Sequence, residues 1–120
     1  EVKANDWGNL DLTDNQETNE KALYDLVSKI VNSNKFPVGL GGEHSLTPSA
    51  VKALHEKYPT LAVVILDAHL DFRKEYEGNP LSHATVTRRV SEIVGINNVR
   101  PIGIRSVSQS EITEARAIGG

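Results

Sequence analysis

An apolar run that ends in a group of ionisable side chains constrains the fold of this chain more than any other feature. Residues 63–66 read Val-Val-Ile-Leu, and Asp67, His69 and Asp71 follow them directly. Three β-branched residues in such a run favour a strand that is buried on both faces, as the strands of parallel sheets are. The run therefore predicts a parallel sheet within an α/β fold.

The ionisable residues after this run indicate chemistry at the end of the strand. In open α/β sheets, ligands collect at the carboxyl ends of strands, and alternate positions share one side while the backbone stays extended. Two carboxylates and one imidazole favour Mn²⁺, with zinc and iron as alternatives. In the competing interpretation, Asp67 caps a turn, His69 is an ordinary loop histidine and Asp71 is solvated.

A second short apolar run, residues 36–41, leads to another histidine, His44. The Gly41-Gly42 pair permits positive φ and a close approach of the backbone to a ligand. Ser45 or Thr47 is a candidate cap for the helix that follows. A tight turn with a surface histidine is the alternative for this segment. The presence of two strand ends that both lead to histidines favours a shared metal site.

Hydrophobic spacing and turn residues predict an alternation of helices and strands along the rest of the chain. The predicted elements are a helix at 17–32, a strand at 36–41, a helix at 47–57, a strand at 61–67, a charged loop at 72–82, a helix at 84–94, a strand at 98–104 and a last helix from about 108. This order favours one layered α/β domain with right-handed crossovers.

Composition narrows the classes of function. The net charge of -3, with both signs interspersed, provides no basic patch for nucleic acid and no polybasic membrane segment. No apolar run is long enough to span a bilayer. The absence of cysteine excludes disulfides and thiolate zinc sites. This composition agrees with a soluble enzyme, and the lack of cysteine fits a reducing compartment, so we expect a cytoplasmic protein.

Three motifs resemble those of the ureohydrolase family, which includes arginase and agmatinase. They are Gly41-Gly42-Glu43-His44-Ser45, Asp67-Ala68-His69-Leu70-Asp71 and Ser82-His83-Ala84-Thr85. The resemblance is closest to agmatinase, because Arg88-Arg89 follows the third motif and because Gly103-Ile104-Arg105-Ser106 is agmatinase-like. It implies an arginase-like, three-layer α/β/α fold with a parallel sheet, of which residues 1–120 form a central part of a single ureohydrolase domain.

The resemblance also implies a reaction and roles for particular residues. The expected reaction is manganese-dependent hydrolysis of a guanidino compound, in the first place agmatine to putrescine and urea, by a hydroxide that two manganese ions bridge. His44, Asp67, His69 and Asp71 match four of the six usual metal ligands, and His83 matches the proton-carrying catalytic residue. The other two ligands belong to a D-x-D motif, and no Asp follows Asp71 in these 120 residues. A homo-oligomer, a trimer or hexamer, is implied as well.

Two alternatives stay open at this point. The substrate can be another ureohydrolase substrate, such as guanidinobutyrate, arginine or formiminoglutamate, and Ala84 bears on this choice because it replaces the usual glycine of the third motif. The chain can also be a non-catalytic fragment or subunit, since two of the family's metal ligands lie outside it. Arg88 and Arg89 are expected to form surface or intersubunit ion pairs.

Overall fold

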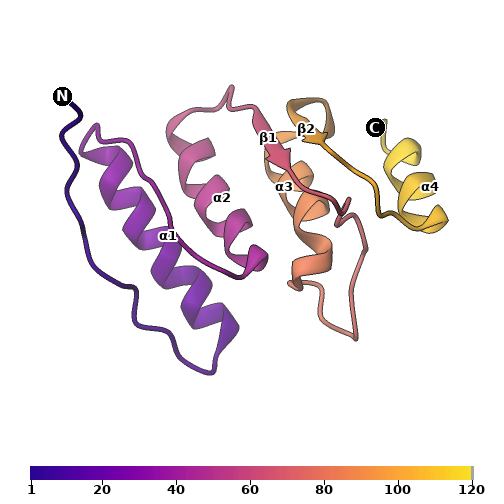
Figure 1. The fold of residues 1–120 in the computed structure, drawn as a ribbon, viewed down its shortest axis with the longest axis horizontal. Coiled ribbons are helices and arrows are strands. Elements are labelled where there is room, and N and C mark those ends of the chain that lie inside the picture. The colour runs from indigo at the N-terminus through magenta and orange to yellow at the C-terminus, as the bar shows by residue number, and fades with distance from the viewer. Residues whose placement is uncertain (120) are drawn as a thin grey trace.

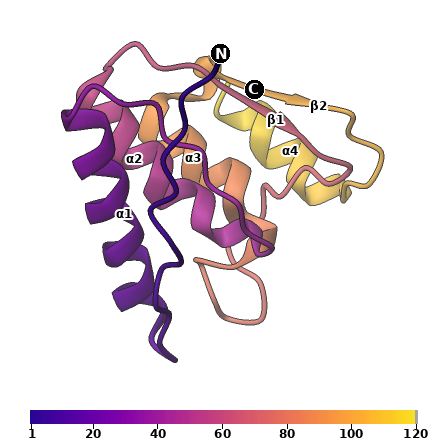
Figure 2. The same cartoon turned by 60° about the vertical axis from the view of Figure 1, so that its left-hand side comes forward.

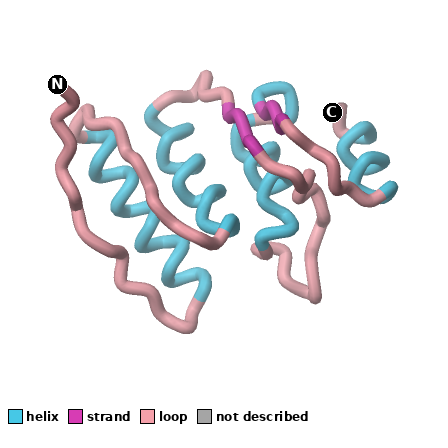
Figure 3. The backbone as a smooth tube through the Cα atoms, in the orientation of Figure 1, coloured by secondary structure: helices cyan, strands magenta, loops and turns pink. Residues whose placement is uncertain are grey.

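The computed structural model describes residues 1–119 and arranges them as helices beside a small parallel sheet (Figures 1 and 3). The regular elements, in order, are α1 Gln16–Asn32, α2 Thr47–Lys57, β1 Val63–Leu66, α3 Val86–Val94, β2 Val99–Ile102 and α4 Gln109–Ala117. Short 3-10 turns occur at η1 His44–Leu46, η2 His83–Thr85 and η3 Ile96–Asn98. The predicted helices and the predicted strands at 61–67 and 98–104 are therefore present, with shorter strands.

The sheet consists of β1 and β2, which pair in parallel with Val63 opposite Val99 and Leu66 opposite Ile102. The chain between these strands contains α3, which packs against both of them. Figure 2 shows α3 and α4 on the same side of the two strands. The predicted α/β class and the parallel sheet are confirmed, and within residues 1–119 the sheet and one helical layer are seen.

Two hydrophobic clusters hold these layers together, and α2 belongs to both. The first lies between α2, α3 and the sheet and contains Val51, Ile65, Val86, Val90, Val94 and Val99. The second lies between α1 and α2 and contains Val27, Val31 and Ala53. Because Val51 and Ala53 extend from different faces of α2, this helix fixes α1 relative to the sheet that carries the candidate site.

The opposite face of the sheet is exposed. Side chains alternate along a strand, so Ile65 enters the core while Val64 and Leu66 are 60% and 78% exposed. Ile102 on β2 is also exposed. This face therefore presents an apolar surface that no described element covers.

The predicted strand at 36–41 is wrong. These residues are assigned to no strand, and Phe36, Val38 and Leu40 are 89%, 77% and 96% exposed. A strand requires a hydrogen-bonded neighbour, and within residues 1–119 the parallel pair of β1 and β2 does not extend to this segment. The apolar residues of this segment are typical of a strand, but the local sequence does not show which neighbouring strand would pair with it.

The start of α2 also differs from expectation. The residue before the helix is Leu46, whose side chain makes no capping bond, so neither Ser45 nor Thr47 caps it. Glu43 instead accepts a hydrogen bond from the Ser45 backbone and caps η1. Gly41-Gly42 does not adopt positive φ.

None of the helices in the described part of the chain combines the length and apolar character needed to cross a membrane.

Candidate metal centre

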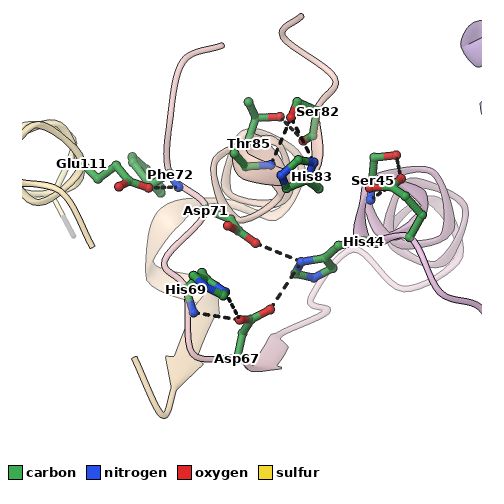
Figure 4. Close-up of polar contacts among 12 residues, drawn as sticks. His44, Ser45, Asp67, His69, Asp71, Phe72, Ser82, His83, Thr85 and Glu111 are labelled. Carbon is green, nitrogen blue, oxygen red and sulfur yellow. Dashed lines mark hydrogen bonds and ion pairs between the residues drawn. The ribbon is translucent and has the colours of Figure 1, made fainter. Parts of the chain in front are cut away.

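His44, Asp67 and Asp71 converge on one point at the carboxyl end of β1 (Figure 4). The His44 Nδ1 atom lies 3.0 Å from Asp71 Oδ2 and 3.5 Å from Asp67 Oδ2. One ligand atom from each of the three residues lies within 4.8 Å of the other two. The structure thus brings together side chains from two of the three motifs, across 27 residues of sequence.

The local backbone conformation positions each of these three side chains at the site. Asp67 leaves β1 while its N–H still donates to Ile102 O, so the ladder of the sheet fixes its position. Asp71 has a φ of 51°, in the left-handed region that Asp tolerates better than most residues. His44 is the first residue of η1, directly before α2. The site therefore depends on a strand end, a backbone reversal and a helical turn.

Asp67 lies between two histidines. Its Oδ1 atom accepts a hydrogen bond from the His69 backbone at 2.7 Å and lies 3.3 Å from His69 Nδ1, while its Oδ2 atom faces His44. The His69 side chain is 65% exposed and lies outside the group of three converging ligands. Asp67 therefore closes a local turn, as the competing interpretation expected, and also faces the cluster with its other oxygen.

The two carboxylates change the protonation of His44. The hydrogen bond to Asp71 raises the pKa of His44, although partial burial opposes this, and the charge of Asp67 raises it further. The backbone hydrogen bond from His69 lowers the pKa of Asp67, and the nearby His44 adds to this effect. The two carboxylates therefore favour positive charge at this point of the site.

The donor set is consistent with a divalent cation. Two carboxylates and one imidazole provide mixed oxygen and nitrogen ligands that can turn toward a common centre in place of their mutual hydrogen bond. His69 lies on the other side of Asp67. There, His69 and the second oxygen of Asp67 together offer ligand atoms for a second ion. Of the four predicted ligands, three converge and the fourth contacts Asp67.

The cluster lines an open pocket of about 760 Å³ that His83 also lines. His83 begins η2, and its ring contacts Tyr76 edge to face, with the two ring centroids 5.5 Å apart. The guanidinium of Arg73 lies over the other aromatic ring, 5.3 Å from the centroid of Tyr76. His83 is therefore placed on the same cavity as the cluster, with Tyr76 and Arg73 beside it.

Tyr76 and Glu111 also line this pocket, although no sequence motif pointed to them as site residues. Glu111 could have been found, because Ser108 three residues before it gives the capping-box pattern S-x-x-E at the start of a helix. Tyr76 carries no comparable signal, because its contact with His83 depends on how the loop at 72–82 folds.

Arg88 and Arg89 lie away from the cluster and form ion pairs, as expected. Both contact Glu92, Arg88 also contacts Glu114 of α4, and Arg89 donates to Lys74 O. Their role in this structure is to fasten α3 to its neighbours.

Comparison with known proteins gives consistent matches. The Arginase family profile matches residues 1–119. The agmatinase of Bacillus cereus is 42% identical over 120 residues, which are 99% of this chain and 41% of that protein. The N(1)-aminopropylagmatine ureohydrolase of Thermococcus kodakarensis is 46% identical over 88 residues, 73% of this chain and 28% of that protein.

A solved structure shows the same arrangement of elements. The agmatine ureohydrolase of Thermoplasma volcanium has a TM-score of 0.82 and 40% identity, and the match covers 88% of this chain and 35% of that chain. The described chain therefore spans about 41% of the length of the B. cereus relative.

Proposed function

This chain belongs to the arginase family, and from that premise we propose that it contributes most of the metal ligands and the proton carrier of a manganese-dependent agmatinase. The convergence of His44, Asp67 and Asp71 in a pocket that His83 also lines carries the proposal. The names of two relatives, an agmatinase and an agmatine ureohydrolase, support agmatine as the substrate.

The residues divide into two roles in this proposal. Asp67, Asp71, His44 and His69 hold the metal, with Asp67 between the two histidines. A bound pair of manganese ions would supply Lewis acidity and lower the pKa of water, so that a nucleophile is available near neutral pH.

His83 is assigned to proton transfer. Its imidazole is exposed and lines the pocket, and an imidazole in that position can donate a proton to the amine that leaves the guanidinium carbon. The contact with Tyr76 restricts the orientation of the ring.

Urea release by the natural gene product tests the proposal. We expect turnover of agmatine that requires added Mn²⁺ and is lost on chelation. Guanidinobutyrate and arginine serve as comparison substrates in the same assay, and formiminoglutamate is tested by release of formamide, because it carries a formimino group and cannot yield urea. Preference for one of these would overturn agmatine as the substrate, and no manganese-dependent turnover of any of them would overturn the enzymatic proposal.

A second substrate follows from one specific observation. The T. kodakarensis relative, whose name gives N(1)-aminopropylagmatine as its substrate, is 46% identical over 88 residues. This compound keeps the guanidino group and lengthens the amine end, and the pocket of about 760 Å³ is open at the surface. Ratios of kcat/KM for the two compounds decide between them.

A further inference from the structure

We propose that Glu111 is a positioning residue for Asp71. Glu111 lies on α4, 40 positions after Asp71 in sequence, and its carboxylate holds the backbone immediately beyond that aspartate. The proposal rests on the metal-binding role given to Asp71 above, and it assigns a function to a buried acid that lies outside the group formed by His44, Asp67 and Asp71. Figure 4 shows the contact between Glu111 and Phe72 beside the cluster.

The backbone at Asp71 needs such support. Asp71 has a φ of 51°. For a residue with a Cβ atom, this conformation is higher in free energy than the right-handed helical and extended conformations. This reversal sends the side chains of Asp71 and Phe72 in different directions. The carboxylate of Asp71 faces His44, and the ring of Phe72 is buried, with 1% of the residue exposed. The Phe72 N–H is consequently a buried donor, and a buried donor without a partner is costly.

Glu111 supplies that partner. Its Oε1 atom accepts the Phe72 N–H at 3.0 Å, and the residue is only 6% exposed. A hydrogen bond to an ionised carboxylate is stronger than one between neutral groups. The charge of Glu111 is retained in the buried site, since hydrogen bonds and the nearby Arg73 offset the cost of burial.

The bonds reported for the backbone of residues 70, 71 and 73 join backbone atoms to backbone atoms. The Leu70 N–H donates to Ser106 O, the Arg73 N–H donates to Ala84 O, and Asp71 O accepts from the Arg88 N–H. The bond from Phe72 therefore differs from its neighbours, because its acceptor is a side chain. A single substitution can remove it and leave the backbone partners of the segment in place.

The bonds of Glu111 argue against direct contact with substrate. While Oε1 serves Phe72, Oε2 accepts from the Ser108 backbone at 2.9 Å and from the Ser108 hydroxyl at 2.7 Å. Both oxygens are engaged within the protein. Glu111 thus joins the first turn of α4 to the backbone that directs Asp71.

Two alanine variants of the natural gene product separate this role from simple helix capping. Ser108→Ala removes the hydroxyl that caps α4 but leaves the bond between Glu111 and Phe72. Glu111→Ala removes the side-chain bonds to both Ser108 and Phe72 but leaves the Ser108 hydroxyl to cap the backbone of α4. Mn²⁺ affinity is measured by competition with a chelator, and exchange of the Phe72 and Leu70 amides is measured by NMR in the metal-free protein. Glu111→Gln, which keeps one acceptor oxygen, serves if Glu111→Ala does not fold.

We expect Glu111→Ala to weaken Mn²⁺ binding about 10-fold or more and Ser108→Ala to change it less than about twofold. Exchange of the Phe72 amide should accelerate relative to that of Leu70 in Glu111→Ala only. Equal effects of the two variants on affinity and exchange would overturn the proposal and leave Glu111 as a capping residue. If the unaltered protein binds no Mn²⁺, the proposed metal function fails, and Phe72 exchange still decides whether Glu111 holds this backbone.

Discussion

At the scale of single residues, Asp67 organises the candidate site because its two oxygens face two different histidines. His44 is on one side and His69 on the other, at 3.5 and 3.3 Å from Nδ1 of each ring. The Asp67 carboxylate can therefore bind one ion through each oxygen. A site for a single ion would need only one of these oxygens. Substitutions can test whether the proposed metal ligands and His83 have different roles.

We expect His69→Ala and His83→Ala to impair the natural gene product in different ways. His69→Ala removes a proposed ligand and should lower bound manganese and abolish urea release. His83→Ala should keep its manganese but lose about 10²–10⁴-fold in kcat, because only proton transfer is affected. Metal analysis of the purified variants beside steady-state kinetics checks this. Loss of manganese from His83→Ala would show that its assigned role is wrong.

Glu111 should make stability depend on pH in the acid range. Burial alone would raise the pKa of Glu111, but hydrogen bonds from Ser108 and Phe72 outweigh it and hold the pKa below its ordinary value of 4.5. A lowered folded-state pKa stabilises the protein above about pH 4.5, and this contribution is lost as the pH falls through the folded-state pKa.

Thermal unfolding of the natural gene product and of Glu111→Gln between pH 3 and 7 measures this effect. Since Gln does not ionise, the advantage in Tm of the unaltered protein should be largest above about pH 4.5 and should shrink below it. An advantage that stays constant across this range would show that ionisation of Glu111 does not contribute.

At the scale of elements, the turn after β2 approaches the candidate site closely. Gly103 has a φ of 90°, and a Cβ atom built there would lie 3.3 Å from the backbone oxygen of Asp67. Both the conformation and the space at this position favour glycine. The position of Asp67 therefore depends on β2 and its turn as well as on β1.

We expect Gly103→Ala to destabilise the natural gene product by at least about 1 kcal/mol, because alanine must adopt the left-handed region. It should also weaken Mn²⁺ binding, since the added methyl group presses on the Asp67 backbone. Gly39→Ala is the matched control, because Gly39 has open space around it and no positive φ. Denaturant unfolding and metal titration give the two readouts, and equal effects of both substitutions would contradict this account.

At the scale of the whole molecule, the described residues 1–119 leave apolar surface exposed. Val64, Leu66 and Ile102 form one uncovered face of the sheet, and Phe36, Val38 and Leu40 are exposed in the extended segment. Monomeric proteins rarely expose contiguous apolar patches of this kind, and such patches promote association.

We predict that residues 1–120 expressed alone self-associate and release no urea from agmatine with excess Mn²⁺. Val64→Glu should reduce the association, because it places a charge on the uncovered face opposite Arg100. Asn97→Glu adds the same charge at an exposed position outside the strands and serves as the control. Light scattering measures association, and turnover on the order of 1–10³ s⁻¹ by these residues would contradict the prediction.

The sequence by itself determined the local elements and the residues of the candidate site. Helical spacing gave α1 and α2 almost to the residue, and the apolar run gave β1. The motifs named His44, Asp67, His69, Asp71 and His83, which all line one pocket. These features were accessible because periodicity and residue chemistry are written in short stretches of the chain.

Only the tertiary structure decided which segments pair and which side chains meet. Residues 36–41 have the composition of a strand, yet a strand also requires a neighbour with free hydrogen-bonding groups, and no local pattern specifies one. The contact of Glu111 with Phe72 joins residues that are 39 positions apart, and that of Tyr76 with His83 depends on how their loop folds. Such contacts arise from the packing of whole elements, which is why sequence patterns found the candidate site residues but not Glu111 and Tyr76, which line the same pocket.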